Sequence, residues 1–187
     1  TSDTRVSKQY SSDSTDLSSF GSDQTFTIQV GHYYLDNLTG SPTQGQKIYQ
    51  RVDISVTVAA ASFAKKNSEA LSDIASAINN AMSTALITDH DYDGNDINEK
   101  KLDSIDIVRA DVVSEDGGNS RLVLKSASSG YSYRIDFTDS ADSFLSGLEV
   151  GNNSQMSGSS GGFITNVGTG VTDSLLNSKF IVSGLTF

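Results

Sequence analysis

Apolar and polar residues alternate strictly in two segments of the first third of the chain, TFTIQVG (25–31) and RVDISVTV (51–58). A period of two is the pattern of a half-buried β-strand, which turns one face to a core and the other to solvent. The segment between them, NLTGSPTQGQ (37–46), is dense in turn-forming residues. Together the three segments predict a β-hairpin with an enlarged tip.

The next segment, SEALSDIASAINNAM (68–82), has the period of a helix. Its apolar residues recur at the spacing i, i+3, i+4, i+7, which makes one apolar stripe; they are Leu71, Ile74, Ala75, Ile78, Met82 and Ala85. Ser68 is the expected N-cap. Because an antiparallel sheet can be covered on one face only, we expect this helix to pack across one face of a sheet.

A second hairpin is predicted by DIVRADVV (106–113) and RLVLKS (121–126), since the Gly117–Gly118 pair between them suits a tight turn. The alternation in YSYRIDF (131–137) predicts a strand that continues the sheet, and SKFIVSGLTF (178–187) predicts one more strand. The polar, serine-rich residues before position 25 are expected to form a linker or a peripheral strand.

These elements predict an α+β fold that is mainly antiparallel β, with strand hairpins, one amphipathic helix packed on a sheet, and a second small β subdomain. Residues 25–137 would form the main α/β module. The predicted core of this module consists of apolar residues from the two hairpins and the helix: Phe26, Ile28, Leu71, Ile74, Ile78, Leu122 and Leu124.

The composition of the chain argues against several classes of partner and of chemistry. Thirteen basic and 23 acidic side chains give a net charge of −10, and such a surface repels phosphate backbones and anionic lipids. The sequence has no apolar run near the roughly 20 residues that a membrane-spanning helix needs. We therefore expect neither nucleic acid nor membrane as a partner. Because the chain contains no cysteine, disulfides, thiolate catalysis and cysteine-based zinc sites are excluded.

One segment resembles a metal-binding loop. In DHDYDGND (89–96), Asp89, Asp91 and Asp93 are followed by a glycine, as in the first half of an EF-hand calcium loop. The second half does not fit, because Lys100 occupies position twelve, where a bidentate glutamate belongs. The segment is thus a weak calcium candidate, and a solvated acidic loop is the alternative. We expect no other metal and no cofactor.

Catalytic residues are not indicated. The two histidines, His32 and His90, are 58 positions apart, and no G-x-S-x-G nucleophile elbow occurs. We therefore expect that the protein is not an enzyme. Tyr33, Tyr34 and Tyr49 lie at the enlarged hairpin tip among turn formers, where a core position is harder to sustain, and tyrosine is favoured at interfaces. They are the candidate interface residues.

The order of the elements resembles the flagellin hook IN module. That module has a strand hairpin, a helix with the motif Leu-x-x-Ile-Ala-x-x-Ile-Asn, and a glycine-tipped hairpin that ends in Leu-Val-Leu-x-Ser. The helix motif is matched by Leu71, Ile74, Ala75, Ile78 and Asn79, and the second hairpin by residues 121–126 with Gly130. The flanking segments VSKQYSSDSTDLSSFGSDQTFTIQVG (6–31) and LLNSKFIVSGLTF (175–187) resemble the entry and return strands of the head region in the flagellar cap family, the filament cap or hook-associated protein 2.

This resemblance implies a head-domain fragment of a cap that sits on the distal end of the bacterial flagellum and promotes flagellin polymerisation. It implies self-association into a ring in the full-length protein, flagellin subunits as partners, and an extracellular location reached by the flagellar type III export route. The chain alone is expected to be a monomer. The resemblance also implies that residues 1–24 pair with 138–187 to form the second β subdomain.

Two other functions remain open at this point. The same module occurs in the variable outer domain of flagellin and hook-type subunits, which pack in many copies along a filament. A surface adhesin is the other alternative, and it would bind a ligand through the tyrosines or the acidic loop.

Overall fold

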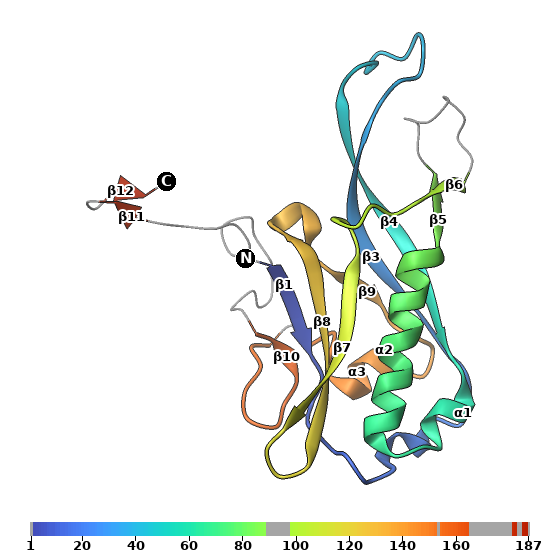
Figure 1. Ribbon diagram of the computed structural model, residues 1–187, viewed down its shortest axis with the longest axis vertical. Helices are drawn as coiled ribbons and strands as arrows, with labels where there is room; N and C mark the ends of the chain where they lie inside the picture. Colours follow the sequence, from blue (N-terminus) through green and yellow to red (C-terminus); the bar gives the residue numbers. More distant parts are fainter. Residues whose placement is uncertain (1, 89–97, 153, 165–180, 183–184, 187) are drawn as a thin grey trace.

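The computed structural model describes residues 2–88, 98–152, 154–164, 181–182 and 185–186, and its fold is α+β with antiparallel strands, as predicted (Figure 1). The strands are β1 (Ser2–Val6), β2 (Tyr10–Ser11), β3 (Gln24–Leu35), β4 (Lys47–Val58), β5 (Leu86–Thr88), β6 (Asn98–Lys101), β7 (Val108–Glu115), β8 (Asn119–Ser129), β9 (Asp136–Thr138), β10 (Gly162–Phe163), β11 (Ile181–Val182) and β12 (Leu185–Thr186). The α-helices are α1 (Ala60–Phe63), α2 (Asn67–Thr84) and α3 (Phe144–Leu148), and short 3₁₀ helices span Asp16–Ser19 and Tyr131–Tyr133.

Both predicted hairpins are present. β3 and β4 pair without a register shift from Gln24 opposite Val58 to Leu35 opposite Lys47, and β9 adds to the other edge of β3. β7 and β8 form the second hairpin, in which Gly117 and Gly118 both have positive φ, 78° and 75°. Only glycine adopts two such conformations in succession at little cost, so the prediction of a tight glycine turn is confirmed.

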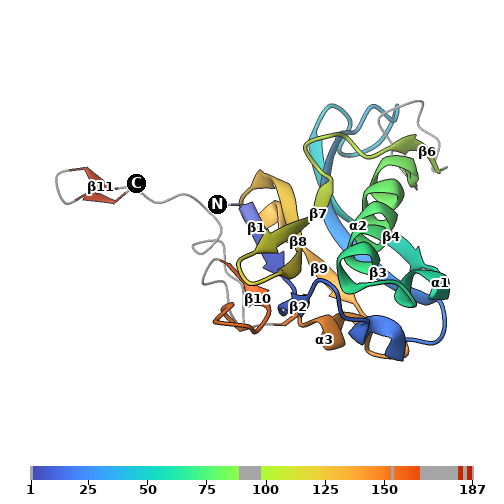
Figure 2. The same ribbon diagram turned by 60° about the horizontal axis from the view of Figure 1, so that its bottom comes forward.

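The helix α2 packs between the two sheets. Figures 1 and 2 show it lying along β7 on one side and β4 on the other. Five of the six residues of the predicted apolar stripe are buried, and Ala85 is half-buried. The side chains predicted as the core of the module belong to one cluster, and none is more than 2% exposed: Phe26, Ile28, Leu71, Ile74, Ile78, Leu122 and Leu124.

Four phenylalanines close one end of this core. The ring of Phe144, on α3, lies 4.9 Å from that of Phe20, 5.3 Å from that of Phe63 and 5.8 Å from that of Phe26, measured between ring centroids. Phe63 belongs to α1 and Phe26 to β3. The 138–187 segment therefore adds to the same core as the predicted module, through a short helix that the sequence pattern did not indicate.

The predicted strand over residues 131–137 is wrong in its first half. Tyr131–Tyr133 form a 3₁₀ helix, and the strand β9 begins only at Asp136. Gly130 adopts φ 109°, a conformation that breaks an extended chain. The following backbone then packs so closely on β3 that a Cβ at Gly31 would lie 1.8 Å from the Ser132 carbonyl oxygen. Alternation alone cannot distinguish this packing from a strand.

Ser68 is not the N-cap of α2. The helix begins at Asn67, its N-cap position is Lys66, and Lys66 makes no capping hydrogen bond through its side chain. Asn67 is buried and holds the helix start to the N-terminal segment, because its Nδ2 donates to the Ser11 carbonyl at 2.8 Å and to Asp16 Oδ2 at 2.7 Å. The Ser68 hydroxyl donates to the Ser12 carbonyl at 3.1 Å.

The N-terminal strand lies inside a sheet. β1 pairs with β10, so the N- and C-terminal segments do meet, but its other edge pairs with β8 of the predicted module. The strand order is β10-β1-β8-β2, with β7 on the opposite edge of β8. The predicted boundary after residue 24, between the second β subdomain and the main module, therefore runs through one continuous sheet.

Two buried arginines strengthen this sheet. Arg5 makes two hydrogen bonds to Asp3, at 2.8 and 2.9 Å, and its guanidinium lies 3.8 Å from the centre of the Phe163 ring. Arg121 donates to both carboxylate oxygens of Glu115, to the carbonyls of Ser7 and Ser160, and by a short contact to the carbonyl of Gly158. These are charge-assisted hydrogen bonds, which are among the stronger ones in proteins.

Of the last predicted strand, 178–187, the structure describes only residues 181–182 and 185–186. These form two short strands, β11 and β12, that pair with each other. Among the described residues, none of the helices combines the length and apolar character that crossing a bilayer requires.

Candidate interaction surface at the hairpin arm

The outer half of the β3–β4 hairpin, residues 33–49, projects beyond the end of α2 and is named the arm here (Figure 1). The inner halves of the strands alternate between buried and exposed positions, as a core-facing hairpin should. In the outer halves this alternation fades, and most side chains are half-buried or exposed. A hairpin that leaves its core in this way offers both faces to a partner.

The tip of the arm is organised by one buried carboxylate. Asp36 accepts hydrogen bonds from the Leu38 N–H at 3.0 Å, the Ser41 hydroxyl at 2.6 Å and the Thr43 hydroxyl at 2.5 Å. Its backbone carbonyl also accepts from the Gly45 N–H at 2.6 Å. A loop held by this many hydrogen bonds is pre-organised, so it loses little conformational entropy when a partner binds.

Large apolar side chains are exposed on the arm and on the loops beside its base. On the arm these are Leu35 (46% exposed), Leu38 (38%) and Tyr49 (37%); near its base they are Leu86 (51%) and Ile105 (55%). Single exposed apolar residues are ordinary on protein surfaces. Three of them on one projecting hairpin make the arm the candidate contact surface.

The three predicted interface tyrosines lie in the strands of the arm, not in its tip loop. Tyr33 and Tyr49 are opposite each other in register, with ring centroids 4.9 Å apart, and both hydroxyls hydrogen-bond to Ser132. Tyr34 lies on the other face, where its ring stacks 6.3 Å from that of His32. The hydroxyls of Tyr33 and Tyr49 therefore brace the arm, while Tyr49 remains about as exposed (37%) as Leu38 (38%).

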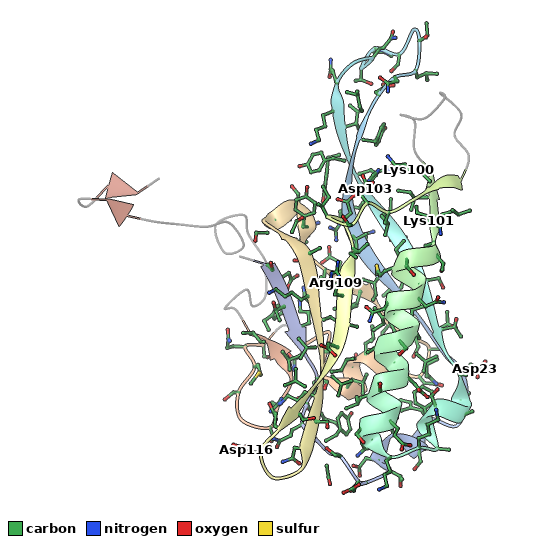
Figure 3. All side chains as sticks on the ribbon, in the orientation of Figure 1. Asp23, Lys100, Lys101, Asp103, Arg109 and Asp116 are labelled. Carbon is green, nitrogen blue, oxygen red and sulfur yellow. The ribbon has the colours of Figure 1, made fainter. Side chains whose placement is uncertain are left out.

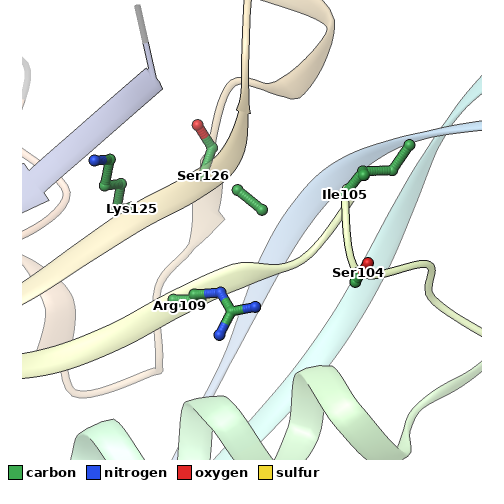
Figure 4. Close-up of a pocket in the computed structure, with 6 residues that line it drawn as sticks. Ser104, Ile105, Arg109, Lys125 and Ser126 are labelled. Atoms are coloured by element: carbon green, nitrogen blue, oxygen red, sulfur yellow. The ribbon is translucent and has the colours of Figure 1, made fainter.

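A groove of about 370 Å³ lies beside the base of the arm (Figure 4). It is lined by Ser104, Ile105, Arg109, Lys125, Ser126 and Ala127. Arg109 and Lys125 are directly opposite each other on β7 and β8, an arrangement of like charges that costs stability. Because neither makes an ion pair with a described acidic residue, the groove is a local positive site on an acidic protein, suited to an anionic group.

The calcium candidate Asp89, Asp91 and Asp93 lies outside the described residues. Among the described residues, His32, Asp103 and Asp106 are brought together at the base of the arm, with one ligand atom from each within 4.8 Å of the others. No sequence motif indicates this cluster, since His32 and Asp106 are 74 positions apart. His32 is fully buried, so it is not placed to act on a bound substrate as a general base.

The geometry thus defines an α+β protein whose most accessible feature is a pre-organised hairpin arm beside a positive groove.

No family model matches the sequence, and no curated protein is similar to it at a significant level. The fold is similar over 100% of this chain to the crystal structure of the D1-D2-D3 domains of the flagellar cap protein FliD from Escherichia coli, with a TM-score of 0.50 and 18% identity. A structure of the FliD D2-D3 domains from the same organism aligns over 87% of this chain, with a TM-score of 0.46 and 17% identity. The chain spans 38% and 59% of the lengths of these two structures.

Proposed function

We propose that this chain is the head, or plate, region of a structural assembly protein of the bacterial flagellum, a cap at the distal filament tip that promotes flagellin polymerisation. The observation that carries the proposal is the similarity of fold between the whole chain and the flagellar cap protein FliD. The order of motifs in the sequence supports it independently, because the hairpin, helix and glycine-tipped hairpin resemble a module of axial flagellar proteins.

On this proposal the protein works by contact and is not an enzyme. The arm would touch flagellin subunits or a neighbouring copy of the head. Its apolar contacts would be Leu35, at the end of β3, and Leu38, in the tip loop that Asp36 holds. Self-association into a ring would belong to the full-length protein, located outside the cell at the flagellum tip after export by the flagellar type III route.

The test is deletion of the parent gene in the source bacterium, followed by assay of the culture medium for monomeric flagellin. A cap holds newly exported flagellin at the growing end, so its loss is expected to release monomers while hooks remain normal. Restoring the full-length gene is expected to stop the release. If the deletion strain keeps filaments of normal length and releases no flagellin, the proposal fails.

A second measurement separates the cap from a filament subunit. A cap is present in a few copies at one end, whereas the variable domain of a flagellin is present throughout. Quantitative mass spectrometry of purified filaments is expected to find the protein at a small fraction of the flagellin amount. Equimolar abundance would contradict the cap and support a subunit that builds the filament.

A further inference from the structure

A buried histidine and a buried carboxylate meet at the base of the arm. His32, on β3, is 0% exposed, and its Nδ1 lies 2.7 Å from Oδ2 of Asp106, whose side chain is 2% exposed. Asp106 belongs to the turn that precedes β7, and its N–H donates to the Asp103 carbonyl at 2.9 Å. This turn places the two aspartates on the same side of His32.

The Asp106 carboxylate is not fully compensated by its protein partners. Its Oδ1 is buried and, within the part of the chain that the structure describes, has no hydrogen-bond partner. A buried carboxylate oxygen without a partner costs free energy, because water has been removed and nothing has replaced it. Buried charges in proteins are normally paired or bound to a metal ion.

The donor atoms around this oxygen match a transition metal. A ring nitrogen of His32 and carboxylate oxygens of Asp103 and Asp106 lie within 4.8 Å of one another. Imidazole together with carboxylate is a usual ligand set for zinc, at metal–ligand distances of about 2.0–2.2 Å. Calcium and magnesium prefer oxygen ligands alone. Three protein ligands leave a further coordination position for water or for a group on a partner.

We propose that His32, Asp103 and Asp106 form a binding site for a divalent transition-metal ion such as zinc. The ion occupies the space between the three side chains, replaces the hydrogen bond between His32 and Asp106, and takes Asp106 Oδ1 or Oδ2 as a ligand. Asp103 is exposed on its turn, so it can move inward to complete the site. The bound ion ties the 103–106 turn to β3, and this turn also supplies Ser104 and Ile105 to the positive groove. The site is independent of the proposed flagellar role.

The test is titration of Zn²⁺ into the chelator-treated chain, prepared without a histidine tag, by isothermal calorimetry. We expect one Zn²⁺ per chain. The variant Asp103→Asn changes an exposed side chain and is expected to fold normally. Its zinc affinity is expected to fall at least about tenfold, because losing even a residue that only supports a metal ligand usually costs that much. The control is Asp116→Asn on the β7–β8 turn, which Figure 3 places near the bottom of the view and far from Asp103; its affinity is expected to be unchanged.

A second measurement identifies the nitrogen ligand. In nuclear magnetic resonance spectra, the ring nitrogens of His32 are expected to shift on zinc addition in the parent chain and in Asp116→Asn, and to shift less in Asp103→Asn. Absence of zinc binding would overturn the site, and so would zinc binding that Asp103→Asn leaves unchanged. Calcium binding in place of zinc would also overturn it, because calcium does not favour the histidine ligand.

Discussion

The side-chain amide of Asn79 makes two hydrogen bonds to the backbone of Ala110, the same pair that a neighbouring strand would make. Its Nδ2 donates to the Ala110 carbonyl at 2.8 Å, and its Oδ1 accepts from the Ala110 N–H at 2.9 Å. Ala110 lies on β7, which pairs with β8 on its other edge. An open strand edge exposes unpaired backbone groups, and Asn79 of α2 satisfies those of Ala110 on the outer edge of β7.

Replacing Asn79 with alanine is expected to destabilise the fold by about 1–3 kcal/mol, because two part-buried hydrogen bonds, each worth about 0.5–1.5 kcal/mol, are lost. The change should appear as a lower urea midpoint when unfolding is followed by circular dichroism. Asn80→Ala is the matched control, since it removes the same side chain from the next, exposed position of α2. Equal losses in the two variants would show that helix propensity, and not the Ala110 contact, causes the effect.

Gly31 allows the Tyr131–Tyr133 turn to lie against β3. A Cβ at this position would lie 1.8 Å from the Ser132 carbonyl oxygen, so Gly31→Ala must displace the turn and weaken the hydrogen bonds from Tyr33 and Tyr49 to Ser132. We expect a loss of about 1–3 kcal/mol, as for overpacked cores, and a smaller tyrosine signal in near-ultraviolet circular dichroism. Gly21→Ala, where nothing lies within 4 Å of the added carbon, should change neither quantity.

The strands differ in how far the sequence pattern reveals them, even within one sheet. β3, β4, α2, β7 and β8 were predicted because each has one buried and one exposed face, and that difference produces a readable period. The residues before position 25 are polar and serine-rich, a composition that favours a linker or peripheral strand over the inner strand β1. β1 also contains Asp3 and Arg5, charged residues that are usually exposed. In the structure these two neutralise each other inside the sheet, which no single-position pattern can show.

The contact surface was predictable only in part. Turn formers between two alternating strands indicated an enlarged hairpin tip, and tyrosine content indicated an interface there. The register of β3 with β4 places Tyr33 and Tyr49 opposite each other, where both hydroxyls bond to Ser132, and Leu35 is the most exposed large apolar side chain of the arm. The cluster of His32 with Asp103 and Asp106 depends on a tertiary contact between distant segments, and that contact leaves no local signal in the sequence.

Asp139 makes stability depend on pH in the acidic range. Burial acts to raise the pKa of its carboxyl, but hydrogen bonds outweigh it and hold the pKa below the ordinary value; they come from the Ser146 hydroxyl and from the N–H groups of Ser146, Leu145 and Ser140. A carboxyl whose pKa is lower in the folded state stabilises that state above its unfolded pKa of about 3.9. This contribution is lost as the pH falls through the folded value.

Asp139 accepts from the N–H groups of Leu145 and Ser146 in the first turn of α3, as a capping side chain does. The variant Asp139→Asn is therefore expected to lose about 1–2 kcal/mol at neutral pH, the magnitude usual for losing such an acceptor. Its deficit relative to the parent chain should shrink as the pH falls below about 4, because the parent carboxyl is then protonated as well. Urea unfolding at a series of pH values measures this difference. Asp116→Asn, at the exposed β7–β8 turn, corrects for the removal of one negative charge; a deficit that stays constant down to the lowest pH would contradict the assignment.

The exposed leucines of the arm give the sharpest test of the contact role. Leu35 and Leu38 are 46% and 38% exposed, so replacing both with serine should change the free energy of unfolding by no more than about 0.5 kcal/mol per site. If these leucines contact flagellin or a neighbouring head, each replacement removes apolar contact from the interface. A loss of about 1.4 kcal/mol in binding free energy lowers the affinity tenfold. Full-length protein with both changes is then expected to leave several-fold more monomeric flagellin in the medium than the unaltered protein.

The control for the arm is a second pair of exposed apolar residues, Val113 on β7 and Ile164 after β10, which are 44% and 49% exposed. Val113→Ser with Ile164→Ser removes a similar amount of apolar surface away from the arm. Flagellin release is expected to stay at the level of the unaltered protein in this variant. Equal flagellin release from both double variants would mean that general surface hydrophobicity matters and not the arm. If the arm variant releases no more flagellin than the unaltered protein, Leu35 and Leu38 are not contact residues.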